Sequence, residues 1–76
     1  MTDIKRIALT NRVDTLREIV AALRQERNFW LRQQAEPWDR KARNELQISH
    51  RITDTKQRLR EAERRLKSCE ISLSGF

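Results

Sequence analysis

The sequence predicts an all-α protein, an antiparallel hairpin of two long helices packed like a coiled coil. Its 76 residues include one Gly and one Pro, too few turn-forming residues for a β-sandwich or barrel. The apolar residues recur at alternating steps of three and four, which is the spacing of a coiled-coil contact stripe. The single proline, Pro37, lies near the middle of the chain. Two amphipathic arms of equal length joined by a short break favour a hairpin.

The first helix is predicted over about residues 3–34. Thr2 or Asp3 is a suitable N-cap, since a short polar side chain accepts a hydrogen bond from the first helical turn. Arg27 is the one charged member of the apolar stripe, and Ala8, Ile19, Ala22 and Leu31 lie on its flanks. The predicted contact stripe of this helix consists of Leu9, Val13, Leu16, Val20, Leu23, Arg27 and Trp30.

A break is predicted at about residues 35–37, followed by a second helix over about 37–70. Proline removes a helical hydrogen bond in a helix interior but suits the first position of a new helix. Residues 71–76 are expected to form a C-terminal tail, so that 1–70 make up a single helical-hairpin domain. The predicted contact stripe of the second helix consists of Trp38, Lys41, Glu45, Ile48, Ile52, Thr55, Leu59, Ala62, Leu66, Cys69 and Leu73.

A hairpin folded at about Glu36 predicts which residues of the two stripes face each other. In that register Val20 faces Ile52, and Arg27 faces Glu45. Because Arg27 and Glu45 then meet with opposite charges, their expected role is to fix the register more than to add stability. The rival interpretation is one continuous helix, kinked at Pro37, in an oligomeric coiled coil.

The hairpin is expected to pack against a further protein surface. Below about 70–80 residues a single core rarely supplies more than ~3–5 kcal/mol, and each of two helices buries only one stripe. The prediction is therefore self-association as a dimer, giving a four-helix bundle, or packing on a partner protein. The sequence leaves the choice between these two open.

The composition argues against an enzyme. His50 is the only histidine and falls on the outward face of the second helix, and Cys69 is the only cysteine. There is no Gly-rich loop to hold a phosphate. We therefore expect no catalytic residues, cofactor, metal site or small-molecule substrate. Because no apolar run approaches the roughly 18 residues of a membrane span and no signal peptide is evident, a cytoplasmic protein without a membrane partner is expected.

Aromatic residues gather around the predicted turn and indicate a protein-binding surface. Phe29, Trp30 and Trp38 lie within ten residues, with Arg27 and Arg40 beside them. Trp and Arg are enriched in the residues that dominate binding energy at interfaces, although the rings could also simply plug the end of the helix pair. The leading hypothesis is a non-enzymatic interaction module that binds and modulates a larger protein or complex, by inhibiting, assembling or stabilising it.

The alternative hypothesis is a nucleic-acid-binding accessory protein. The chain carries 17 Lys and Arg against 11 Asp and Glu, a formal net charge of +6. A basic stripe on the second helix could track the phosphates of DNA or RNA, or it could be an ordinary solvated face in which acids four residues away neutralise part of the charge. The candidate phosphate-binding residues are Arg51, Arg58, Arg60, Arg64, Arg65 and Lys67.

Overall fold

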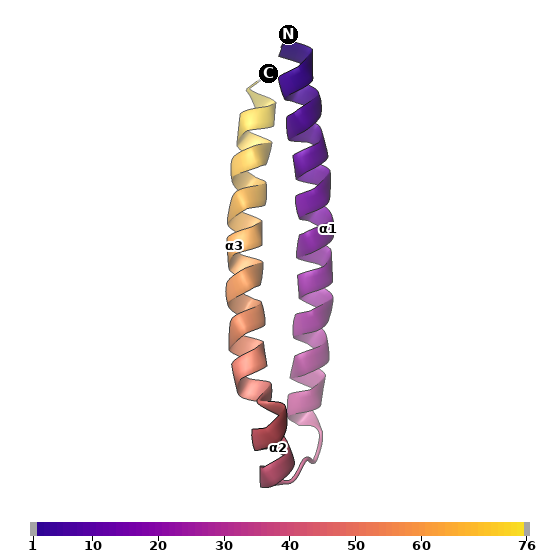
Figure 1. Ribbon diagram of the computed structural model, residues 1–76, viewed down its shortest axis with the longest axis vertical. Helices are drawn as coiled ribbons and strands as arrows, with labels where there is room; N and C mark the ends of the chain where they lie inside the picture. The colour runs from indigo at the N-terminus through magenta and orange to yellow at the C-terminus, as the bar shows by residue number, and fades with distance from the viewer. Residues whose placement is uncertain (1, 76) are drawn as a thin grey trace.

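The computed structural model describes residues 2–75 and is a long helical hairpin (Figure 1). Its elements are α1 (Thr2–Ala35), α2 (Arg40–Leu46) and α3 (Ile48–Ser74). α1 and α3 lie side by side and antiparallel, and the short α2 lies at the end opposite the two termini. The principal extents are 59 × 15 × 14 Å, so the molecule is a rod only two helices thick. We call residues 36–47 the tip.

The core is a single line of side chains between α1 and α3, as the spacing of apolar residues predicts. On α1 the buried residues are Val13, Leu16 and Val20, while Trp30 at the tip end is half-buried. On α3 the stripe is buried from the start of the helix and stays half-buried to Leu73. The buried residues of α3 are Ile48, Ile52, Thr55, Leu59 and Ala62.

The predicted register is wrong. Val20 packs with Leu59 and Ala62 instead of facing Ile52, a shift of seven to ten residues along α3. The tip causes the shift, because it takes up all of residues 36–47 and moves the fold point away from Glu36.

The expected pairing of Arg27 with Glu45 is lost with that register. Arg27 lines a hollow beside Lys56 and Leu59 of α3, whereas Glu45 is exposed in α2. Among residues 2–75 no ion pair joins the two side chains.

The chain leaves α1 where the sequence predicts a break. α1 ends at Ala35, and α2 begins at Arg40 rather than at Pro37. Asp39 is the N-cap of α2, since its carboxylate Oδ1 accepts a hydrogen bond from the Ala42 amide at 2.7 Å, a favourable cap. This start also changes which side of the tip helix is covered: Ala42 and Leu46 are half-buried, whereas the predicted stripe members Trp38, Lys41 and Glu45 are exposed.

A second break, at Gln47, separates α2 from α3 and was not expected. Gln47 has φ 51° and ψ 43°, the left-handed conformation, and its amide donates to the Arg43 carbonyl at 3.0 Å. A left-handed residue at the end of a helix is usually Gly, sometimes Asn. Since Gln carries no such preference, nothing in the sequence marks this bend.

We expect Gln47→Gly to stabilise the hairpin. Glycine adopts positive φ without the steric penalty of a side chain, which is about 1–2 kcal/mol for other residues, so a gain of about 1 kcal/mol is expected. Urea denaturation followed by circular dichroism measures it, with Gln47→Ile as the opposite case, expected to destabilise. Equal stability of the two variants would contradict a left-handed bend at this position.

The C-terminal residues are helical where a tail is expected. α3 continues to Ser74 and is followed by Gly75, whose amide donates to the Ser72 carbonyl at 3.3 Å. The contact stripe explains the extension, because Cys69 and Leu73 remain half-buried beside α1. Phe76, the last residue of the expected tail, lies outside the described residues. Within residues 2–75, no helix combines the length and the apolar character needed to span a bilayer.

Candidate functional site

The three aromatic residues near the turn have different environments. Phe29 and Trp30 pack edge to face in α1, with ring centroids 5.0 Å apart and planes at 76°. Trp30 is half-buried between the helices, whereas Phe29 keeps 47% of its surface exposed. Trp38 lies in the connection between α1 and α2 and is 38% exposed. Phe29 and Trp38 are therefore available to a partner, and Trp30 belongs to the hairpin interface.

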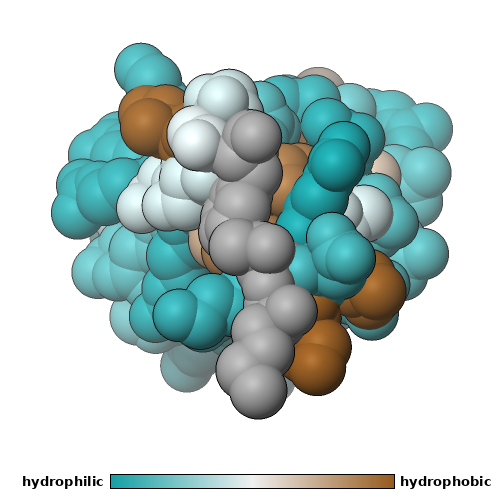
Figure 2. All heavy atoms as spheres, turned by 90° about the horizontal axis from the view of Figure 1, so that it is seen from above, coloured by the Kyte–Doolittle hydropathy of each residue, from teal (hydrophilic) through white to brown (hydrophobic). Residues whose placement is uncertain are grey.

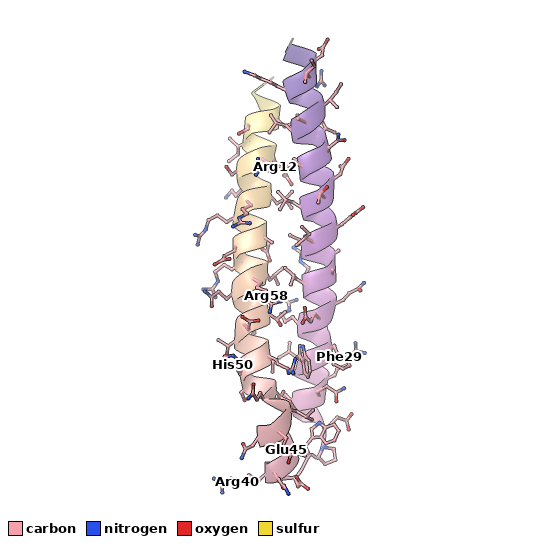
Figure 3. The ribbon with its side chains drawn as sticks, viewed as in Figure 1. Arg12, Phe29, Arg40, Glu45, His50 and Arg58 are labelled. Carbon is pink, nitrogen blue, oxygen red and sulfur yellow. The ribbon has the colours of Figure 1, made fainter. Side chains whose placement is uncertain are left out.

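Arg27 and Arg40, the two arginines predicted for the protein-binding surface, also have different environments. Arg27 is half-buried in the line of side chains between α1 and α3, beside Leu59. Arg40 is exposed at the start of α2 (Figure 3). Of the five residues predicted for a protein-binding surface, the structure exposes Phe29, Trp38 and Arg40 and places Trp30 and Arg27 in the interface. Phe29 lies in α1, whereas Trp38 and Arg40 lie in the tip. We call Trp38 and Arg40 the tip surface.

Arg51, the first residue of the predicted basic stripe, joins three helices. Its guanidinium carbon lies 4.8 Å from the centroid of the Trp30 ring of α1. Its Nε also donates a hydrogen bond to the Leu46 carbonyl at 2.9 Å, one of the carbonyls at the end of α2 that lack a helical partner. These contacts hold the tip together, so Arg51 has a structural role in the hairpin.

The remaining basic residues of α3 lie on two sides of the hairpin. Arg58 forms an ion pair with Asp54, and Arg65 lines a hollow with Arg12 and Cys69. On another side Arg60, Arg64 and Lys67 share a hollow with Arg24 of α1 and with the carboxylates of Glu63 and Glu70. Glu70 also lies 3.9 Å from Arg17. Acids are thus interleaved with the bases, and the six predicted residues do not form one continuous basic surface.

We expect replacement of Arg27 by leucine to stabilise the hairpin. The side chain is half-buried beside Leu59, the cations Lys56 and Arg60, and the carboxylate of Glu63. Because a leucine at this point of the stripe would add apolar contact and remove a half-buried charge that has two cations and one carboxylate around it, Arg27→Leu should raise the free energy of unfolding by about 1 kcal/mol.

The control variant is Glu45→Ala, and urea denaturation measures both variants. Glu45→Ala should leave the urea midpoint unchanged, since Glu45 is exposed and forms no ion pair with Arg27. A loss of stability in both variants would indicate that the two residues are paired after all.

An exposed face of α1 lies where the sequence predicts a flank of the core. Ile19 and Leu31, expected to widen the contact stripe, are 43% and 38% exposed. Ile19 belongs to the set of residues one position before the buried stripe, of which Ala8, Ile19, Ala22 and Phe29 are apolar. These apolar residues are the signal for this face in the sequence. We call these exposed residues the second face of α1: Ala8, Arg12, Thr15, Ile19, Ala22, Glu26 and Phe29.

The end of the rod that carries the termini also exposes hydrophobic side chains. Ile4, Ile7 and Ile71 are each at least 60% exposed. Figure 2, which looks down on this end, shows hydrophobic groups on a mainly hydrophilic surface.

The residues with potential for metal or acid–base chemistry stand apart from one another. His50 is exposed on α3 and Cys69 is half-buried near its end, the positions expected from the spacing. Within residues 2–75 there is no group of three or more His, Cys, Asp or Glu side chains placed to hold a metal ion.

Comparison of the chain with protein-family models, with curated proteins and with solved structures finds no match.

Proposed function

We propose that the protein is a non-enzymatic interaction module that binds a larger protein or complex and modulates it by inhibition, assembly or stabilisation. The observation that supports this is the uneven distribution of exposed hydrophobic residues. Among the described residues, five of the seven large exposed hydrophobic side chains lie on α1, and Trp38 at the tip is a sixth. α3 contributes only Ile71.

The thin shape of the hairpin leaves one side of α1 uncovered. In a rod with a cross-section of 15 × 14 Å, each helix covers only one side of the other. Side chains such as Ile19 and Phe29 lie on a different side of α1 and stay in contact with water. Full burial of a side chain of this size is worth about 1.5–3 kcal/mol. Covering this face with another protein would therefore favour binding of that protein and would also stabilise the fold of the hairpin.

The tip surface is suited to a larger partner. Trp38 and Arg40 are exposed at the end of a rod 59 Å long, where a partner can approach them without contacting the rest of the hairpin. Because aromatic and arginine side chains are the residue types that most often dominate binding energy, we propose this surface as the contact with the larger protein.

The proposal is tested by affinity capture from host lysate. Tagged wild type, Trp38→Ala and the control His50→Ala are compared after nuclease treatment and a high-salt wash, and retained proteins are quantified by mass spectrometry. We expect one protein to remain in fixed ratio to wild type and to the control, and at least tenfold less of it with Trp38→Ala, the effect typical of a dominant interface residue. If all three retain the same proteins equally, with folding confirmed, the tip surface is not the contact.

Nucleic-acid binding is the second candidate function. The observation in its favour is that Arg24, Arg60, Arg64 and Lys67 line a common hollow, although Glu63 and Glu70 share it. Contact with phosphates would give affinity that falls steeply with salt, with a log–log slope of about −0.9 per phosphate neutralised. Fluorescence anisotropy with DNA and RNA measures this slope. A slope near zero, or an unchanged affinity of Arg64→Glu, would reject this function.

A further inference from the structure

We propose that a second copy of this chain packs antiparallel on the second face of α1, so that two hairpins form a symmetric dimer through α1. This inference rests on the proposed function, because it names one protein that the interaction module binds. The second face is exposed along its whole length, from Ala8 to Phe29. Its largest hydrophobic members, Ile19 and Phe29, are 43% and 47% exposed.

The second face of α1 lies beside its buried stripe. Its members occupy the positions one residue before those of the stripe, and four of the seven are apolar: Ala8, Ile19, Ala22 and Phe29. Since one residue turns an α-helix by about 100°, the second face lies roughly at right angles to the stripe. α3 covers the stripe, and the second face remains exposed within the hairpin.

The charges of the second face complement a copy of the same face. Arg12 precedes Ile19 by seven residues and Glu26 follows it by seven. A two-fold axis at Ile19 therefore brings Arg12 of each chain beside Glu26 of the other and sets Ile19 against Ile19, because a two-fold interface pairs each contact reciprocally. Among residues 2–75 neither Arg12 nor Glu26 takes part in an ion pair of its own hairpin.

The same axis also matches the side chains by size. Phe29 follows Ile19 by ten residues and Ala8 precedes it by eleven, so the large ring of one chain meets the small side chain of the other at each end. Figure 3 shows Arg12 and Phe29 well apart along the hairpin, Phe29 toward the tip, which gives the contact a length of several turns. Neither side of α3 outside its buried stripe offers such a face, because its positions there are mostly charged or polar.

Charge reversal tests this pairing on the purified full chain. In Arg12→Glu or Glu26→Arg, both attractive pairs of the dimer become repulsive, and we expect the dimer dissociation constant to rise roughly tenfold or more at low salt. An equimolar mixture of the two variants recovers two attractive pairs in a heterodimer. Arg64→Glu, which makes the same charge change on α3, is the control and should dimerise as wild type does.

Sedimentation velocity gives the oligomeric state, native mass spectrometry distinguishes the heterodimer by mass, and circular dichroism confirms helicity. The inference is supported if each single variant dissociates and the mixture re-forms a dimer with wild-type affinity. It is overturned if wild type is monomeric, if the single variants dimerise as wild type does, or if the mixture stays dissociated. A monomeric wild type that still retains one lysate protein through Trp38 would overturn the dimer and leave the proposed function standing.

Discussion

Replacing Leu59 by alanine should unfold a large fraction of the molecules. Leu59 is 4% exposed and packs with Val20 and Ala62 at the centre of the line of core residues. Truncation of a buried leucine costs about 3 kcal/mol, because the removed methyl groups lose their contacts and a cavity remains. A core of this size supplies only ~3–5 kcal/mol in all, so this single change removes most of the stability.

The control for this prediction is Ile71→Ala on the same helix. Ile71 is 63% exposed, and its replacement should leave the urea midpoint nearly unchanged. Circular dichroism in the far ultraviolet measures both variants against wild type. If Leu59→Ala retains wild-type helicity and midpoint, the contact between α1 and α3 at this position is wrong.

The second large effect is expected for Trp30→Ala, with a loss of about 2 kcal/mol. A fully buried tryptophan costs about 3–5 kcal/mol on truncation, and Trp30 is half-buried. Its ring contacts Phe29 within α1 and the guanidinium of Arg51 on α3. Its removal therefore loosens the attachment of the tip to both long helices.

Trp38→Ala is the matched comparison, since Trp38 lies in the exposed connection and has no place in the core. We expect it to keep wild-type stability while lowering capture of the partner. Arg51→Ala should fall between the two variants, with a loss of about 1 kcal/mol from the contact with Trp30 and the bond to the Leu46 carbonyl. If Trp30→Ala and Trp38→Ala have equal urea midpoints, the assignment of Trp30 to the helix interface and of Trp38 to the surface is wrong.

The buried line of the hairpin is predictable from sequence because its signal is repeated many times. Each step from Leu9 to Trp30, and again from Ile48 to Leu73, reports the same helical period, so single errors do not change the result. The break before Pro37 is equally predictable from sequence, since the proline ring clashes with the preceding turn of a helix and removes a hydrogen bond.

The register is not predictable in the same way, because it depends on the backbone path of the whole tip, residues 36–47. The sequence marks the break at Pro37 but neither the start of α2 at Arg40 nor the left-handed conformation of Gln47 that separates α2 from α3. Val20 therefore packs with residues seven to ten positions beyond Ile52, and the expected meeting of Arg27 with Glu45 is lost.

The candidate site is predictable from the sequence only in part, for the same reasons. Trp30 and Arg27 fall on the buried stripe in the sequence itself, so their place in the interface follows from the helical period. The role of Arg51 required the structure, because its bond to the Leu46 carbonyl exists only where α2 ends.

The most direct measurement is hydroxyl-radical footprinting of the protein in its captured complex and as dilute purified protein. If α1 and the tip are protein-contact surfaces, oxidation of Ile19, Phe29 and Trp38 falls several-fold in the complex. Oxidation of His50 and Ile71, which lie on α3, stays unchanged. Equal oxidation of Ile19, Phe29 and Trp38 in both samples would contradict the interaction module, because these side chains would remain in water in the functional state.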